Sequence, residues 1–225
     1  MSTPPASLAA TGFIVAACRG TEGCENRALD PGDLPQRLAA GLEAMGFGAG
    51  LARLLGRPPK RHELFAVSLS CCPNACSRPQ IADVGLIAAQ RPKADPAQCT
   101  RCWACQDACR EQAVVLLPSG QLDAIDEAAC LACGACIAAC PSGALSPGRS
   151  GWRVQLGGRL GRHPRLAEEL PGLHSADQAV EFALRAARYL LEHARPGQRL
   201  GDLAAKVGAR AVAGLKPGGK PGGKS

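Results

Sequence analysis

Aromatic side chains are scarce in this chain, where Phe, Trp and Tyr together make up 3% of the 225 residues. Proteins that bind nucleic acids often stack bases on aromatic rings or carry a recognisable binding module, and no such module is present. The formal net charge of +7 therefore gives little support to a nucleic-acid partner. We expect no nucleic acid among the partners of this protein.

The sequence also lacks a long hydrophobic run. Its N-terminal segment has no basic residue before Arg19 and only a short apolar stretch, which differs from a signal peptide and from a membrane span. A glycine-rich dinucleotide fingerprint is missing too, so NADH or NADPH would have to act through a partner. Because the chain is rich in cysteine without such a leader, we expect a reducing cytoplasmic location and no membrane association.

Cysteine is abundant: the chain has thirteen, an odd number that does not suit a disulfide framework. Eight of them form two runs with the spacing C-x2-C-x2-C-x3-C, which is typical of bacterial ferredoxins with [4Fe–4S] clusters. The fourth cysteine of each run binds the other cluster in such ferredoxins. The predicted ligands are therefore a first group, Cys99, Cys102, Cys105 and Cys140, and a second group, Cys130, Cys133, Cys136 and Cys109. Zinc is the alternative, but this spacing favours iron–sulfur clusters.

Charge is distributed unevenly along the chain. Residues 93–148 contain six acidic and three basic side chains, a net charge of −3, so the remaining residues carry +10. This contrast predicts an acidic ferredoxin module with two clusters, residues 93–148, inserted into a basic host domain made of residues 10–92 and 149–213. The repeated Pro-Gly-Gly-Lys sequence at the end predicts a disordered tail over residues 214–225.

Hydrophobic periodicity predicts a mixed α+β host. Short apolar runs predict buried strands over residues 12–17, 64–69 and 81–88, with a last strand over 152–156. Helical spacing predicts a bent or divided helix over 34–55, a helix over 176–193 that begins with a Ser175/Gln178 capping box, and a helix over 200–213. A further helix is expected to start at Arg162-His163-Pro164, which makes His163 a helix-start residue rather than a ligand.

Four more cysteines follow two of the predicted strands. Cys18 and Cys24 form a C-x5-C pair after the first strand, and Cys72 and Cys76 form a C-x3-C pair after the second. Open α/β sheets bind ligands beyond the carboxyl ends of their strands. These four residues, the third group, can hold a third [4Fe–4S] cluster, although incidental thiols are the alternative. Cys71 is then the spare cysteine, and we expect it to be buried.

The segments that carry these cysteines resemble a known family. CRGTEGC at residues 18–24 and CCPNACSRPQIADVGL at 71–86 are similar to the sirohaem and [4Fe–4S] site of sulfite and nitrite reductases. The resemblance continues in GWRVQLGGRLGRHPRL at 151–166 and, more weakly, in Gly-Asp-Leu at 201–203. The position of the ferredoxin module is similar to that in anaerobic and dissimilatory sulfite reductase subunits.

This resemblance implies a fold and a site. The fold would be an αβ sheet domain of the sulfite/nitrite reductase type with an inserted dicluster module. The third group would bind a cluster coupled to sirohaem, and Cys76 would be the catalytic bridge to the sirohaem iron. The residues expected to contact sirohaem, whose eight carboxylates call for arginine and other donors, are Arg78, Gly158, Asn74, Arg19 and Arg159.

The implied function is electron transfer from a low-potential donor protein, through the two ferredoxin clusters and the third cluster, to sulfite or nitrite at sirohaem. Sulfite is favoured over nitrite. The chain has only seventeen residues before Cys18, where family members carry a further module that holds the substrate. A second copy of the chain or another reductase subunit would therefore complete the site. The alternative is a non-catalytic electron-transfer protein or a subunit of a larger redox complex.

Overall fold

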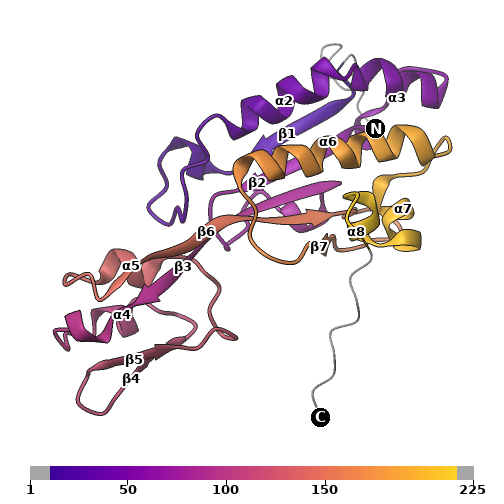
Figure 1. Cartoon of the computed structure of the whole chain (residues 1–225). Helices are drawn as coiled ribbons and strands as arrows, with labels where there is room; N and C mark the ends of the chain where they lie inside the picture. Colours follow the sequence, from indigo (N-terminus) through magenta and orange to yellow (C-terminus); the bar gives the residue numbers. More distant parts are fainter. Residues whose placement is uncertain (1–10, 217–225) are drawn as a thin grey trace, which may run out of the picture.

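A five-stranded sheet in the order β1-β2-β3-β6-β7 organises the computed structural model, which describes residues 11–216 (Figure 1). Strands β1, β2 and β3 are parallel, whereas β6 is antiparallel to both of its neighbours. The strands are β1 (Phe13–Ala17), β2 (Phe65–Ser70), β3 (Val84–Ala94), β6 (Leu145–Leu156) and β7 (Glu168–Glu169). Residues 1–10 and 217–225 lie outside the described residues, and most of the predicted tail lies among them.

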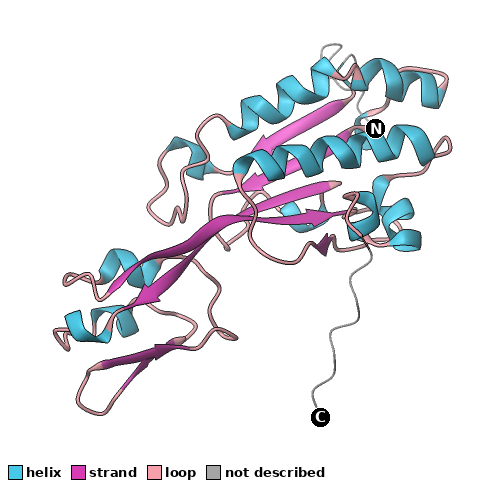
Figure 2. Ribbon diagram, in the orientation of Figure 1, coloured by secondary structure: helices cyan, strands magenta, loops and turns pink. Residues whose placement is uncertain are grey.

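Helices pack on this sheet around one large apolar core (Figure 2). They are α2 (Leu34–Ala44), α3 (Phe47–Leu55), α6 (Ala176–His193), α7 (Leu200–Val207) and α8 (Ala209–Val212). The predicted break within 34–55 is confirmed, because Gly46 takes a left-handed conformation with φ 66° between α2 and α3. The segment 200–213 is likewise divided, at Gly208, where a single helix was predicted.

Two strands are longer than their apolar runs suggest. Strands β3 and β6 pair continuously from Val84 and Leu156 to Ala94 and Leu145, with one irregularity at Gln90 and Pro92. The outer part of this ribbon is polar, so its extended conformation depends on pairing between distant segments. The predicted boundaries of the inserted module, 93 and 148, fall within this ribbon.

The prediction of a helix that starts at residues 162–164 is wrong. Arg159 and Arg165 instead exchange two backbone hydrogen bonds, of 2.9 and 3.0 Å, and close a loop that contains His163 and Pro164. This loop leads to β7, so the strand over 152–156 is also not the last one in the sheet. A proline suits the first turn of a helix, but it also suits a loop, and the local pattern does not separate the two.

The chain between β3 and β6, residues 95–144, forms a lobe that we call the cysteine-rich lobe. It projects from the main sheet and contains a hairpin of two short strands and two short helices (Figure 1). These are α4 (Ala104–Asp107), β4 (Val114–Leu116), β5 (Leu122–Ile125) and α5 (Ala135–Ala139). Its small core is separate from the main one and consists of Cys105, Val114, Leu122, Cys136, Ala144 and Leu145.

Among the described residues, no single helix is both long and apolar enough to cross a bilayer. Helices α2 and α3, which are bent by 55° relative to each other, reach the required length and apolar composition only when they are taken together.

A buried ion pair connects the sheet to α7. The carboxylate of Asp83, which is fully buried, accepts hydrogen bonds from the Ala66 N–H (2.9 Å) and from the Arg199 guanidinium. The same guanidinium donates to the carbonyls of His62 and Leu64. Removal of one partner from such a pair leaves an uncompensated charge in the interior.

We therefore expect Arg199→Ala to lower the free energy of unfolding by about 3–5 kcal/mol. Urea denaturation of the purified protein measures this change. Arg37→Ala is the matched control, because Arg37 pairs with the exposed carboxylate of Asp177 and its loss should leave the unfolding midpoint unchanged. Equal midpoints for the two variants would show that the buried pair contributes no more than a surface pair.

Candidate iron–sulfur centres

The third cysteine group gathers at the carboxyl ends of β1 and β2. Ala17 pairs with Leu69 in parallel register, so Cys18 and Cys71 leave neighbouring strands at the same edge of the sheet. The Cys71 N–H donates to the Cys18 Sγ atom at 3.2 Å, across 53 residues of sequence. The C-x5-C and C-x3-C loops, far apart in the chain, therefore meet at one place.

The first of these loops is held tightly against the second. It contains the 3-10 turn η1 (Arg19–Glu22), whose Gly20 N–H donates to the Cys18 Sγ atom at 3.3 Å. A Cβ atom on Gly20 would lie 2.4 Å from the Cys71 Cβ atom, so glycine is required for this close approach.

Burial differs among the cysteines of this edge. Cys24 and Cys76 are exposed, Cys18 is half-buried and Cys72 is buried. Burial raises the pKa of Cys72, a backbone hydrogen bond from Asn74 lowers it, and the neighbouring thiols of Cys76, Cys18 and Cys24 raise it. Cys71 is 1% exposed, so its expected burial is confirmed, and burial raises its pKa to about 12.

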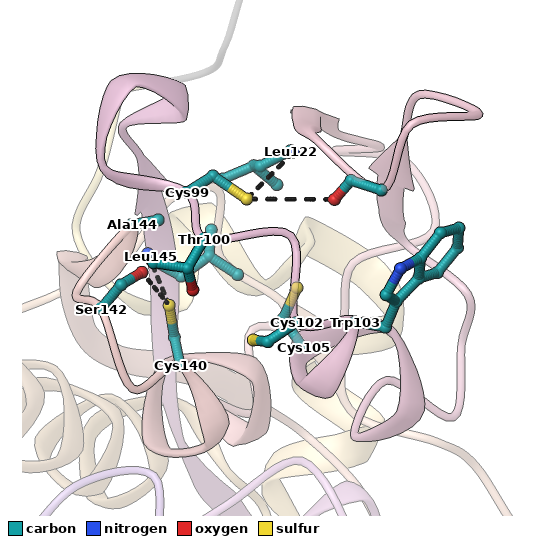
Figure 3. A pocket seen from close by; sticks show the side chains of 11 residues that line it. Cys99, Thr100, Cys102, Trp103, Cys105, Leu122, Cys140, Ser142, Ala144 and Leu145 are labelled. Carbon is teal, nitrogen blue, oxygen red and sulfur yellow. Dashed lines mark hydrogen bonds between the residues drawn. The ribbon is translucent and has the colours of Figure 1, made fainter.

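The first cysteine group lines a small cavity in the cysteine-rich lobe (Figure 3). Cys99, Cys102 and Cys105 come from the first run, whereas Cys140 comes from the end of the second. The Leu122 N–H donates to Cys99 Sγ at 3.3 Å and the Leu145 N–H to Cys140 Sγ at 3.4 Å. The structure thus brings together the four residues that the crossover rule predicts.

The second group is also assembled from both runs. Burial, together with the proximity of Cys109, Cys133 and Cys130, raises the pKa of Cys136 to about 12. Cys109 lies two residues after the end of α4, while Cys136 lies within α5, so the two short helices contribute to the same site. In the first group, burial raises the pKa of Cys140. Hydrogen bonds from Leu145, Ser142 and Ala144 outweigh this effect and lower the pKa below its usual value.

The two runs share a backbone conformation that the sequence does not reveal. In each run, the residue two positions after the first cysteine donates its N–H to that cysteine's sulfur at 3.4 Å. Positive φ angles recur at matching positions, with values of 60° and 57° at Arg101 and Ala132 and of 62° and 77° at Trp103 and Gly134. Non-glycine residues adopt such angles at an energetic cost, so the repetition indicates a shape imposed by a common ligand type.

A site for a single metal ion requires its ligands to lie closer together than the ligands of an iron–sulfur cluster. Within residues 11–216, no three His, Cys, Asp or Glu side chains converge closely enough to hold one ion. In a [4Fe–4S] cluster, by contrast, each of four thiolates binds a different iron atom.

The residues predicted to contact sirohaem fall into two sets. Arg19, Asn74 and Arg78 lie on the cysteine loops and are exposed, and the Asn74 Nδ2 atom donates to Cys76 Sγ at 3.0 Å. The other two, Gly158 and Arg159, contact other parts of the chain. A Cβ atom on Gly158 would lie 2.6 Å from the Gln80 carbonyl oxygen, and the Arg159 guanidinium pairs with Asp202 and donates to the His163 carbonyl at 2.8 Å. Packing within the chain is therefore sufficient to explain both residues.

Most of the chain matches a known protein family. The family model described as "Nitrite and sulphite reductase 4Fe-4S domain" matches residues 14–213. A coenzyme F420-dependent sulfite reductase of Methanocaldococcus jannaschii is 34% identical over 118 residues, which cover 52% of this chain and 18% of that protein.

A solved structure gives the same indication for the fold. The crystal structure of dissimilatory sulfite reductase I aligns with a TM-score of 0.61 and 19% identity, over 90% of this chain and 52% of that one. The Mycobacterium tuberculosis NirA protein aligns with a TM-score of 0.49 and 19% identity, over 88% of this chain and 26% of that one. The chain thus spans about half of the first solved relative and less than a fifth of the curated one.

The expected α+β sheet of the sulfite/nitrite reductase type is confirmed by this structural likeness. The family model covers most of the described chain and includes all four cysteines of the third group. The chain therefore belongs to the family of nitrite and sulphite reductase 4Fe–4S domains.

Proposed function

We propose that this chain is the [4Fe–4S] and sirohaem domain of a sulfite reductase, with nitrite as the second candidate substrate. In this proposal electrons pass from two ferredoxin-type clusters in the cysteine-rich lobe to a third, sirohaem-coupled cluster at the sheet edge. The observation that carries the proposal is that cysteines from distant segments converge: Cys99, Cys102, Cys105 and Cys140 line one cavity, and the C-x5-C and C-x3-C loops meet at the sheet edge. A carrier with two clusters would need only the eight cysteines of the lobe.

Each group would hold one cluster, and Cys76 would be shared with the sirohaem iron. When bound, sirohaem would supply the iron at which the oxyanion is reduced. The residues at the third group suit this ligand, because Cys76 is exposed at the end of its loop and its sulfur accepts a hydrogen bond from Asn74. Arg19 and Arg78 lie on the same loops and are exposed, where guanidinium groups can pair with carboxylates.

The proposal requires partners. A low-potential protein would donate electrons to the cysteine-rich lobe. A second copy of the chain or another reductase subunit would supply further residues that bind the anionic substrate. We place this assembly in the cytoplasm, where thiolates remain available to iron.

The second candidate is a non-catalytic iron–sulfur protein that transfers electrons within a larger redox complex. One observation favours it: Gly158 and Arg159, which the resemblance assigns to sirohaem, are engaged within the chain. In that case the third group would still hold a cluster, but no macrocycle would bind beside Cys76.

A chain produced without oxygen, in a host that makes sirohaem, separates the two candidates. We expect about twelve cluster irons and twelve acid-labile sulfides per chain, together with one sirohaem iron and a macrocycle absorption band. Cys76→Ala should abolish the band while about eight irons of the lobe remain, whereas Cys71→Ala, the matched control, should keep both. Twelve irons without a macrocycle would support the electron-transfer protein, and about eight irons in the unaltered chain would show that the third group holds nothing.

A further inference from the structure

The three cysteine groups lie in a fixed order along β3. Ser70, the last residue of β2, pairs with Ile87, so the loops of the third group begin beside this point of β3. Three residues further on, the Gln90 N–H donates to the carbonyl of Ala132 at 2.7 Å, and Gln90 bridges to Cys133. The second group is therefore the nearer of the two lobe groups to the third.

The first group lies at the far end of the same strand. Ala94 pairs with Leu145, and the Leu145 N–H donates to Cys140 Sγ. At roughly 3.3 Å per residue, Ile87 and Ala94 are about 23 Å apart along the strand. The second group therefore lies between the first and the third, which makes the first group the outermost one.

An apolar surface is exposed beside this outermost group. Trp103 is 44% exposed, and its indole packs on Gly120 at the rim of the cavity that Cys102 also lines (Figure 3). Leu117, also 44% exposed, belongs to the same turn, because its carbonyl accepts a hydrogen bond from the Gly120 N–H at 2.8 Å. We call Trp103 and Leu117 the hairpin patch. The other tryptophan, Trp152, is buried, so exposure of Trp103 is not a general property of the chain.

The negative charge of the segment that carries the patch favours a positively charged partner. Residues 93–148 carry a net charge of −3, whereas the rest of the chain carries +10. A partner with a positively charged face is therefore attracted to the lobe and repelled from the remainder of the molecule. Exposed tryptophan is the residue type most often found at the energetic centre of protein interfaces.

We propose that the hairpin patch is the surface on which a redox protein with a positively charged face docks, so that electrons enter at the first cysteine group. This inference rests on the proposed function, because it requires clusters in the lobe. One electron is exchanged per encounter, between the redox centre of the partner and the lobe, and no bond is made or broken.

The reaction is measurable in the reverse direction with cytochrome c, which has a ring of lysines around its haem edge. The anaerobic holoprotein is reduced with dithionite, freed of excess reagent and mixed with oxidised cytochrome c, which takes up one electron as its haem iron changes from Fe(III) to Fe(II). We expect the second-order rate constant to fall about tenfold or more between low and physiological salt. Titration calorimetry of the two oxidised proteins provides a binding readout that does not depend on turnover.

Variants locate the contact. Trp103→Ala should lower both the rate constant and the affinity about tenfold. Leu117→Lys, which opposes the lysine ring with a like charge and lies away from the cysteines, should do the same with an unchanged iron count. Leu166→Ala, at an apolar residue of the host domain that is 68% exposed, is the matched control and should react like the unaltered chain.

The outcomes separate this inference from the proposed function. Unchanged rates for Trp103→Ala and Leu117→Lys, or a larger loss for Leu166→Ala, would overturn the docking surface while the cluster count stands. Absence of iron from the lobe of the unaltered chain would overturn the proposed function first. A rate that rises with salt would reverse the sign of the charge that we assign to the partner.

Discussion

Cys109→Ala is expected to remove about four of about twelve cluster irons, and to remove them from the second group although Cys109 belongs to the first run. The physical reason is the position of the residue. Cys109 follows α4, and its proximity, like that of Cys133 and Cys130, contributes to the raised pKa of Cys136 in α5. A cubane that loses one of four thiolates loses a ligand to one iron, and the vacant position is open to solvent and oxygen.

Double variants turn this expectation into a test of the crossover. Cys109→Ala combined with Cys136→Ala removes two ligands of the same cluster, so about eight irons should remain, as in either single variant. Cys109→Ala combined with Cys105→Ala affects both lobe clusters, so only about four should remain. Iron and sulfide counts per chain measure the difference, and Cys71→Ala is the control. The reverse result would mean that each run holds its own cluster.

The sequence predicts those parts of the fold that local patterns determine. Helix α6 begins where its capping box indicates, since the Gln178 N–H donates to Ser175 Oγ at 3.2 Å and the Ser175 N–H to Gln178 Oε1 at 2.9 Å. Strands β1 and β2 coincide with their apolar runs, although β2 is buried along most of its length and β1, at the edge of the sheet, is buried only at Phe13. In these elements, short-range preference and long-range packing favour the same conformation.

Other parts depend on partners distant in sequence. The outer half of β3 is polar, and it is a strand because β6 returns beside it after the lobe. The loop at 159–165 is likewise closed by backbone hydrogen bonds and by the contact of Gly158 with Gln80, and no local sequence pattern predicts these contacts. The local pattern at Pro164, a proline near basic residues, instead predicts the start of a helix.

The candidate site shows the same division. Cysteine spacing predicts which residues come together, because a cluster requires four thiolates at short range. The spacing does not reveal the left-handed conformation at Arg101 and Trp103, since neither residue type favours it. It also does not show that Arg159 is neutralised by Asp202, a residue 43 positions away.

Removal of iron is expected to unfold the cysteine-rich lobe and to leave the main domain folded. The lobe has few buried side chains, and two of its six core residues are the ligand candidates Cys105 and Cys136. Domains of this size rarely bury enough apolar surface to be stable, and they depend on metals or disulfides. Structural metal sites in comparably small domains contribute about 10 kcal/mol or more to folding, which exceeds what the remaining four core residues can replace.

Hydrogen exchange with mass spectrometry tests this on holoprotein and on protein stripped of iron anaerobically. Amides of β4 and β5 should lose protection by about a thousandfold or more after stripping, because the lobe then opens without the main core. Amides of β2 should keep their protection, since Phe65, Val67 and Leu69 are buried in the large apolar core of the main domain. Equal protection of β4 and β5 in both samples would show that the lobe folds without iron. In that case the repeated left-handed positions of the two runs would have to be stabilised by the polypeptide alone, in a lobe whose apolar core is too small for that cost.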